Sequence, residues 1–327
     1  MTVVVFGIDA LDPELVDPEV HPYLTLDRYE TIDTILSSVG RPSTHELWPT
    51  IITGLAPEEH GLLLDDGVAW DNPLLRTGSN IADHVLPETV QTKLGALLLN
   101  KTSEDAFRIP ASHYEENGLS TVFDEHDATA IGVPNYVVDT DSKDREHEIR
   151  CSLGGLFERD PDAETGHTTG DVEEFYDRCM EMVMIRTARI RHALRSRGNE
   201  LVFGYTSGLD LIGHVSHDRP AVQQRAYEEM NHFVGELAAD LTEDDVLILV
   251  SDHGLQDGMH TDEAMIASSE GRLLEEVGHV TDVRSAIESE LGRRQHRPTG
   301  REFGSIEGFE SENSEAVREQ LEELGYL

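Results

Sequence analysis

The sequence predicts an α/β fold in which helices cover both faces of a doubly wound, mainly parallel sheet. Short, nearly continuous apolar runs at residues 2–8, 201–205 and 246–250 are typical of strands buried on both faces. A segment with helical periodicity precedes the second run, and another precedes the third. This alternation of helix and buried strand is the pattern of a doubly wound sheet.

The individual elements differ in how clearly the sequence marks them. Apolar residues recur on one helical face over residues 172–194 and again over 222–241, which predicts two amphipathic helices. Weaker patterns predict a helix near residues 81–99 and a strand at 129–133 that ends at a proline. Three apolar residues within 317–324 suggest one short closing helix.

The distribution of these elements suggests one domain over residues 1–327 with an insertion. Residues 1–64 and 171–268 carry the clear strands and helices and are predicted to form the core. Turn-rich, acidic stretches place an inserted cap at about 65–170, and charge dominates an acidic C-terminal extension at about 269–327.

The composition is strongly acidic. The chain has 327 residues with 65 Asp and Glu against 25 Lys and Arg, a formal net charge of −40, and only three of the cations are lysines. Such a charge repels nucleic acid, so a protein that coats DNA or RNA is excluded. Acid-rich, lysine-poor surfaces resemble those of proteins from salt-loving archaea, and we expect this chain to come from a halophilic archaeon.

Neither a membrane span nor a cysteine-based site is expected. No apolar run approaches the roughly 18 residues that a transmembrane helix needs, and the N-terminus has no basic region before its apolar residues. We therefore expect a cytoplasmic protein. The two cysteines, Cys151 and Cys179, provide neither a disulfide framework nor a zinc–thiolate site.

Ionisable residues follow each of the three buried strands. Because the carboxyl ends of parallel strands open onto one crevice, the aspartates there should converge, and histidines accompany two of them. The aspartates are Asp9, Asp210 and Asp252, and the histidines are His214, His253 and His260, with His279 as a substitute for His260. A lone aspartate after a strand is usually a cap or turn residue, so it is the joint pattern that indicates a metal site.

These six side chains predict two divalent ions rather than one. Mixed carboxylate and imidazole ligands suit zinc, with manganese or iron as alternatives, and a single zinc site needs only three or four ligands. Two such ions roughly 4 Å apart can hold the attacking and leaving oxygens of a displacement at phosphorus. Hydroxyls for the attack occur in the segment 40–54, at Ser43, Thr44, Thr50 and Thr53.

Five motifs resemble the alkaline phosphatase superfamily, in particular its type I phosphodiesterase and nucleotide pyrophosphatase branch, and they occur along the chain in the order found in that family. The nucleophile segment of that branch is matched by Thr44 through Trp48, Thr53-Gly54, Pro57 and His60-Gly61. The remaining matches are Gly7-Ile-Asp9, Asp210-Leu-Ile-Gly-His214, Ser251-Asp-His-Gly254 and His260. The resemblance implies an alkaline phosphatase-like fold and a metal-dependent hydrolase of small-molecule phosphate esters.

The resemblance also implies a role for each site residue. One metal would be held by Asp210, His214 and His260. The other would be held by Asp9, Asp252 and His253 and would touch the oxygen of Thr44. Thr44 would attack phosphorus, and the resulting phospho-threonine would then be hydrolysed.

The chain departs from the family pattern at some positions. Glu46 stands where a proline is common, and residues 64–66 lack the asparagine that holds the phosphoryl group in nucleotide pyrophosphatases, which argues against nucleotide diesters. Arg41 is a possible source of positive charge, although an exposed loop arginine is the simpler interpretation.

Other functions on the same core remain open. The sequence around Thr44 lacks the Cys/Ser-x-Pro-x-Arg pattern of formylglycine sulfatases, which disfavours that class. Phosphonate hydrolysis, phosphosugar mutase chemistry and a catalytically inactive metal-binding or interaction protein are alternatives. The sequence identifies neither the leaving group nor the oligomeric state.

Overall fold

The structure is a computed structural model that describes residues 1–37, 40–63, 108–139, 145–154, 156–159, 167–196 and 198–293. The helices expected near residues 81–99 and 317–324 lie outside these ranges. No helix in the described ranges is long and apolar enough to cross a membrane.

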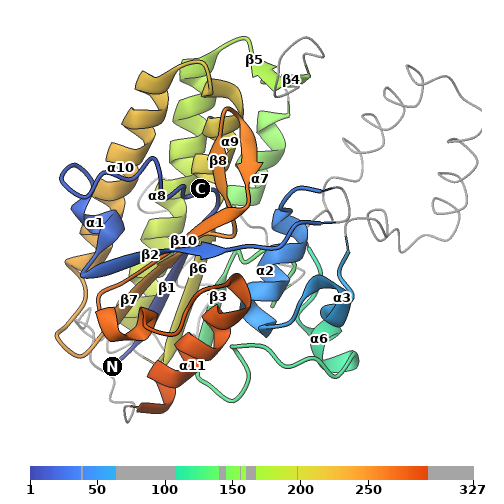
Figure 1. The fold of residues 1–327 in the computed structure, drawn as a ribbon, viewed down its shortest axis with the longest axis vertical. Coiled ribbons are helices and arrows are strands. Elements are labelled where there is room, and N and C mark those ends of the chain that lie inside the picture. The colour runs from blue at the N-terminus through green and yellow to red at the C-terminus, as the bar shows by residue number, and fades with distance from the viewer. Residues whose placement is uncertain are drawn as a thin grey trace, which may run out of the picture.

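A six-stranded, mainly parallel sheet forms the centre of the molecule (Figure 1). Its order is β2-β10-β7-β1-β6-β3, with β7, β1, β6 and β3 parallel and β10 antiparallel to both of its neighbours. The strands are β1 (Val3–Ile8), β2 (Arg28–Asp33), β3 (Ala128–Ile131), β6 (Leu201–Thr206), β7 (Val246–Val250) and β10 (Glu263–Ser268). The three strands predicted from apolar runs are β1, β6 and β7, adjacent at the middle of the sheet.

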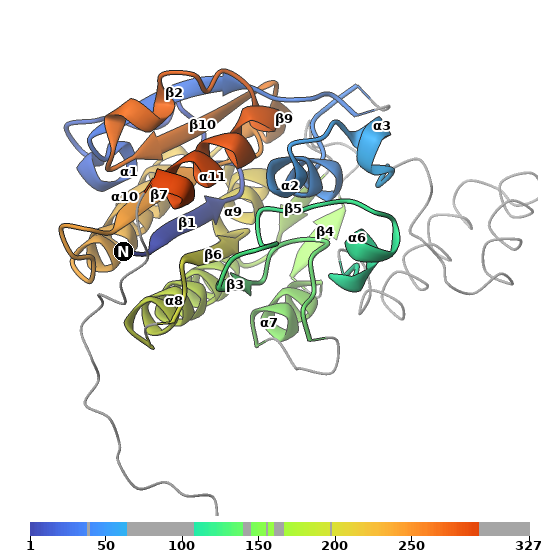
Figure 2. The same ribbon diagram turned by 90° about the horizontal axis from the view of Figure 1, so that it is seen from below.

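Helices pack on both faces of this sheet (Figure 2), as predicted. One face carries α1 (Pro22–Thr25), α7 (Arg145–Leu153), α8 (Val172–Ser196), α9 (Gly208–Ser216) and α10 (Pro220–Ala238). The other carries α2 (Thr44–Thr53), α3 (Pro57–His60), α6 (Ser112–Glu116), the 3₁₀ turns η2 (Gly271–Leu274) and η3 (Val280–Asp282), and α11 (Val283–Arg293). Helices α8 and α10 are the two amphipathic helices that the sequence predicts.

Strand β1 shows why the sequences of these strands are continuously apolar. Val4, Phe6 and Ile8 belong to the core on the α8 side, whereas Val3 and Val5 belong to the core on the α2 side. All five side chains are fully buried. Each contributes about 1.5–3 kcal/mol relative to an exposed position, so both helical layers are held to the sheet by the same strand.

Two elements outside the ranges expected to form the core pack with the central sheet. Strand β3 lies within the range predicted as a cap, yet it pairs in parallel with β6 as the edge strand of the main sheet. Helix α11 lies within the predicted extension, yet it buries Val283 and Ile287 in the α2-side core. An edge strand of four residues and a helix with few apolar positions give too weak a periodicity to be assigned to the core.

Two short hairpins complete the described elements. Strands β4 (Phe157–Arg159) and β5 (His167–Thr169) pair with each other, as do β8 (Gly254–Gln256) and β9 (Met259–Thr261). The second hairpin follows the end of β7 and carries His260 back toward the carboxyl ends of the parallel strands.

Candidate metal centre

The carboxyl ends of β1, β6 and β7 bring three buried aspartates together, as the topology predicts. Asp9 follows β1 directly, and Asp252 comes two residues after β7. Asp210 lies in the first turn of α9, the helix that follows β6. All three are buried.

The first group of candidate ligands consists of Asp210, His214 and His260. His214 lies one helical turn after Asp210 on α9, and its Nε2 is 3.2 Å from Oδ1 of that aspartate. Nε2 of His260, from β9, lies at the same distance from the same oxygen. The two Nε2 atoms are 3.1 Å apart, so all three side chains converge on one point.

The second group consists of Asp9, Asp252 and His253, and all of it is buried. Nε2 of His253 lies 3.3 Å from Oδ1 of Asp9 and 3.4 Å from Oδ2 of Asp252. The ring of His253 stacks on that of His260 with 3.8 Å between centroids. The two groups are therefore neighbours in one centre.

Backbone carbonyls fix the tautomer of all three histidines. Nδ1 of His214 lies 2.9 Å from the carbonyl oxygen of Gly258, and Nδ1 of His253 lies 3.0 Å from that of Gly254. Nδ1 of His260 is likewise 3.0 Å from the carbonyl oxygen of Pro42. A carbonyl only accepts, so each Nδ1 carries the hydrogen and each Nε2 of a neutral ring is an acceptor that faces carboxylates.

This arrangement fits divalent cations. Acceptor nitrogens face acceptor oxygens in both groups, and both carboxylate oxygens of Asp252 are buried without a hydrogen-bond partner among the described residues. A buried carboxylate in this state needs a cation or a proton. Each group offers three nitrogen or oxygen ligands, and a second hydrogen bond orients each histidine, as is common at protein metal sites.

Burial and neighbouring charges shift the pKa values of the side chains in this centre. Burial, together with repulsion by Asp210, raises the pKa of Asp9 to about 6, and burial beside Asp9 raises that of Asp252 well above its ordinary value. Burial alone would also raise the pKa of Asp210, but His214 and His260 hold it well below the usual range. Asp210 in turn raises the pKa of His214 to about 9 despite burial. Cation binding here would displace protons.

Thr44 places a hydroxyl against this centre. It is the first residue of α2, and its Oγ1 lies 3.4 Å from both carboxylate oxygens of Asp9 and 3.3 Å from Nε2 of His253. The hydroxyls of Thr50 and Thr53 instead donate to carbonyls within the helix, those of Glu46 and Pro49. Ser43 is the N-cap residue and forms no side-chain capping bond.

A glycine and a tryptophan position α2 against the sheet. A Cβ atom on Gly7 of β1 would lie 2.5 Å from the ring of Trp48, so only glycine at this position lets the helix pack this closely. Trp48 is fully buried and meets the ring of Tyr205 edge-on, with 4.9 Å between centroids. The Gly7-Ile-Asp9 motif therefore supplies both Asp9 and the contact against which the helix of Thr44 packs.

His60 has a structural role in the same segment. Its Nδ1 accepts a hydrogen bond from the backbone of Leu62, and its Nε2 lies 3.1 Å from the hydroxyl of Thr50. Burial lowers its pKa to about 4, so the ring is neutral at neutral pH. It ties α3 to α2 and does not reach the metal centre.

Sequence reasoning missed two residues that support this centre. Tyr205 donates a hydrogen bond from its hydroxyl to Oδ2 of Asp9 at 2.5 Å. Asn135 donates to the carbonyl oxygen and to Nδ1 of His45, both at 2.9 Å, and so holds the residue after Thr44. Tyr205 could have been found from the pairing of β6 with β1, which places it beside Gly7. The sequence around Asn135 gives no comparable signal.

The remaining expected positions lie elsewhere. His279 caps η3, where its Nδ1 accepts from the backbone of Thr281, and it belongs to neither group, so His260 needs no substitute. Arg41 is exposed, in keeping with the simpler interpretation. Residues 64–66, where an asparagine was missing, lie outside the described ranges.

A family model and several solved structures match this chain. The family model of type I phosphodiesterase / nucleotide pyrophosphatase matches residues 3–323. Among solved structures, the PH0037 protein from Pyrococcus horikoshii shares 12% identity at a TM-score of 0.46, covering 91% of this chain and 98% of that one. An alkaline phosphatase from the Antarctic bacterium TAB5 shares 14% identity at a TM-score of 0.43, covering 90% and 98%. No curated protein matches the chain. By its family match, the chain belongs to the type I phosphodiesterase / nucleotide pyrophosphatase family and is a phosphoric ester hydrolase.

Proposed function

We propose that the protein hydrolyses small-molecule phosphate esters with two divalent ions and a covalent phospho-threonine formed on Thr44. The observation that carries this proposal is the position of the Thr44 hydroxyl, 3.3 Å from a histidine nitrogen whose other nitrogen is engaged by a backbone carbonyl. Asp210, His214 and His260 would hold one ion, and Asp9, Asp252 and His253 the other. Zinc suits these ligands best, with manganese or iron as alternatives.

The two ions would supply positive charge that lowers the pKa of the Thr44 hydroxyl and neutralises the phosphoryl oxygens. Thr44 would form the new bond to phosphorus while the ester oxygen leaves, and water would later break the phospho-threonine bond. Its place at the N-terminus of α2 adds the positive end of a ten-residue helix dipole beside the anionic phosphoryl group.

Several described side chains would keep the nucleophile and ligands in place. The Tyr205 hydroxyl fixes one oxygen of Asp9, so the other oxygen is directed toward His253. The amide of Asn135 holds the backbone just after Thr44. Fixed partners of this kind orient ligands and nucleophile before substrate binds.

Substitution of Thr44 distinguishes a hydrolase from a protein that binds metal but has no activity. Thr44→Ala should lose several orders of magnitude in kcat while retaining metal and fold, because the covalent path is removed. Thr44→Ser should keep part of the activity. Ser43→Ala is the matched control, since its hydroxyl neighbours Thr44 and makes no capping bond. Rates would be measured with bis-p-nitrophenyl phosphate, p-nitrophenyl phosphate and p-nitrophenyl sulfate.

The covalent intermediate can be observed directly. Rapid acid quench during turnover, followed by peptide mass spectrometry, should find phosphate on the peptide that contains Thr44. Full activity in Thr44→Ala would rule out covalent catalysis by this residue. Activity that survives there but is lost in Ser43→Ala would move the role to Ser43.

A further inference from the structure

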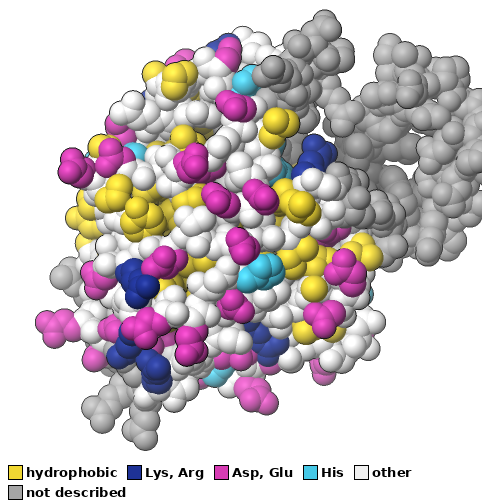
Figure 3. Space-filling model, in the orientation of Figure 1, with side chains coloured by type: hydrophobic (Ala, Val, Ile, Leu, Met, Phe, Trp, Pro, Cys, Tyr) yellow, Lys and Arg dark blue, Asp and Glu magenta, His cyan; other side chains and the backbone are white. Residues whose placement is uncertain are grey.

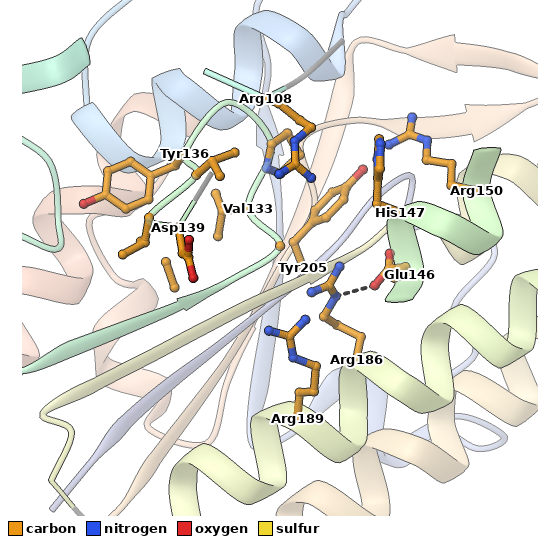
Figure 4. Close-up of a pocket in the computed structure, with 15 residues that line it drawn as sticks. Arg108, Val133, Tyr136, Asp139, Glu146, His147, Arg150, Arg186, Arg189 and Tyr205 are labelled. Atoms are coloured by element: carbon orange, nitrogen blue, oxygen red, sulfur yellow. Dashed lines mark ion pairs between the residues drawn. The ribbon is translucent and has the colours of Figure 1, made fainter. Parts of the chain in front are cut away.

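A cavity of about 180 Å³, shown in Figure 4, is lined by Tyr205, whose hydroxyl contacts Asp9 of the metal centre. Its wall consists of the loop after β3, residues of α7 and α8, and Tyr205 at the end of β6. Figure 4 shows Arg186 and Arg189 extending from α8, His147 and Arg150 on α7, and the ion pair between Arg186 and Glu146 that joins the two helices.

The lining of this cavity is rich in positive charge. Four arginines line it, namely Arg108, Arg150, Arg186 and Arg189, together with His147. Two carboxylates, Asp139 and Glu146, also line it. Acids outnumber Lys and Arg by 65 to 25 in the whole chain, so a lining with twice as many guanidinium groups as carboxylates reverses the general composition. A local reversal of charge at a cavity favours an anionic ligand.

One buried ion pair joins the two helices that line the cavity. Arg186 and Glu146 are both buried and form an ion pair between α8 and α7. Gly132, at a φ of +69°, lies directly against the Arg186 guanidinium, and a Cβ atom there would collide with it. Glu146 offsets the charge of Arg186, so this pair adds no net charge to the lining. The rest of the lining holds three arginines and one carboxylate, that of Asp139.

The cavity is connected to the metal centre through two side chains. Tyr205 lines the cavity and donates its hydrogen bond to Asp9. Asn135, in the lining loop, holds His45 next to Thr44. Although burial alone would lower it, the pKa of Arg150 is raised by Tyr205, Asp9 and Asp210, in keeping with a guanidinium beside the centre.

Resting on the proposed function, we propose that this cavity binds a second anionic group of the substrate, a carboxylate or a phosphate. The preferred substrates are then phosphate esters with two anionic groups, one at the metal centre and one among the arginines. Guanidinium groups bind both anions through paired, charge-assisted hydrogen bonds. In a partly enclosed site these contacts are screened less than on the surface.

A matched series of diesters tests this proposal. All would release p-nitrophenolate, and the second ester group would be a short alkyl chain ending in a methyl group, a carboxylate, a phosphate or an ammonium group. We expect kcat/KM for the two anionic chains to exceed that for the neutral chain by about tenfold or more, with the ammonium chain poorest. The carboxylate and phosphate arms identify which anion is preferred.

Arg189→Gln changes the charge of the cavity at an exposed position, so the fold should survive. The ratio of kcat/KM for anionic over neutral chains should fall about tenfold in this variant and be partly kept in Arg189→Lys. Arg178→Gln is the matched control, because Arg178 is a partly exposed arginine of the same helix that does not line the cavity. A wild-type ratio near one, or the same fall in both Gln variants, would overturn the proposal.

Binding distinguishes failure of this proposal from failure of the proposed function. Calorimetry on the metal-loaded Thr44→Ala protein would compare propylphosphonate with propane-1,3-diyl bisphosphonate. Tighter binding of the bisphosphonate that weakens in an Arg189→Gln background supports the cavity even if no diester is turned over. Equal affinity for both phosphonates, with normal turnover of the neutral diester, would reject the cavity and leave the hydrolase intact.

Discussion

Tyr205 lies between the metal centre and the arginine-lined cavity and contacts both. Its hydroxyl contacts Asp9, its ring contacts Trp48 of α2, and it also lines the cavity. It is buried, and burial beside Asp9 raises its pKa well above the ordinary value, so the hydroxyl stays a donor.

Tyr205→Phe removes this donor and keeps the ring. We expect kcat/KM to fall by about 10- to 100-fold and the affinity for one of the two metals to weaken, because Asp9 loses the partner that orients it. Tyr176→Phe, a buried tyrosine of α8 on the far side of the sheet, is the control. Titration with a chelator, followed by activity, measures both effects; unchanged metal affinity in Tyr205→Phe would show that Asp9 is oriented without it.

The sequence predicted the aspartates and histidines of the metal centre but not the groups that hydrogen-bond to them. Asp9 and Asp252 follow apolar strands within two residues, so the polypeptide itself fixes where they emerge. The partners of the histidine Nδ1 atoms are carbonyls, such as those of Pro42 and Gly258, which every residue type carries. Residue identity therefore contains no signal for them.

Helix α2 contains an internal proline, and a residue outside the helix supplies the hydrogen bond that this proline cannot donate. Pro49 has no N–H, so the carbonyl of His45 one turn earlier receives no helical hydrogen bond. Asn135 donates to that carbonyl from the loop after β3. The loop that lines the cavity is thus tied to the helix of Thr44.

A double-mutant cycle tests this coupling. Asn135→Ala should lower the free energy of unfolding by about 1–3 kcal/mol, since it leaves the carbonyl without a donor. In a Pro49→Ala background, residue 49 regains an N–H, and the cost of Asn135→Ala should be smaller by about 1 kcal/mol. The cost of alanine at the positive φ of Asn135 is the same in both backgrounds and cancels. Denaturant melts of the four proteins measure this; equal costs would mean that the carbonyl is not the partner that matters.

Elements with a continuous apolar run or a long amphipathic face were predictable, and short ones were not. Strands β1, β6 and β7 and helices α8 and α10 each bury enough side chains to leave a clear period in the sequence. Strand β3 is only four residues long and only its last side chain is fully buried. Its place in the sheet depends on pairing with β6, which is decided by tertiary structure.

Across the whole molecule, acidic side chains are spread over the visible surface with few lysines or arginines between them (Figure 3). A formal charge of −40 on 327 residues destabilises the compact state by self-repulsion at low ionic strength. Salt reduces the range of this repulsion from about 10 Å at 0.1 M to about 3 Å at 1 M.

We therefore expect the melting temperature to rise by roughly ten degrees or more between about 0.1 M and about 3 M potassium chloride. A nonionic osmolyte at matched osmolarity is the control, because it stabilises compact states without screening charge. Calorimetry or circular dichroism would record the transition. A melting temperature independent of salt would contradict adaptation to concentrated salt and would leave the metal centre unaffected.

Elemental analysis of the protein after gentle, metal-supplemented purification measures whether each chain holds two divalent ions. We expect about two equivalents in the wild type and about one in Asp210→Ala and in Asp252→Ala, since each variant disables one group of three ligands. Asp218→Ala, at an exposed site beyond both groups, should keep two. A folded protein that holds no divalent ion, or the same number in all four proteins, would contradict the assignment.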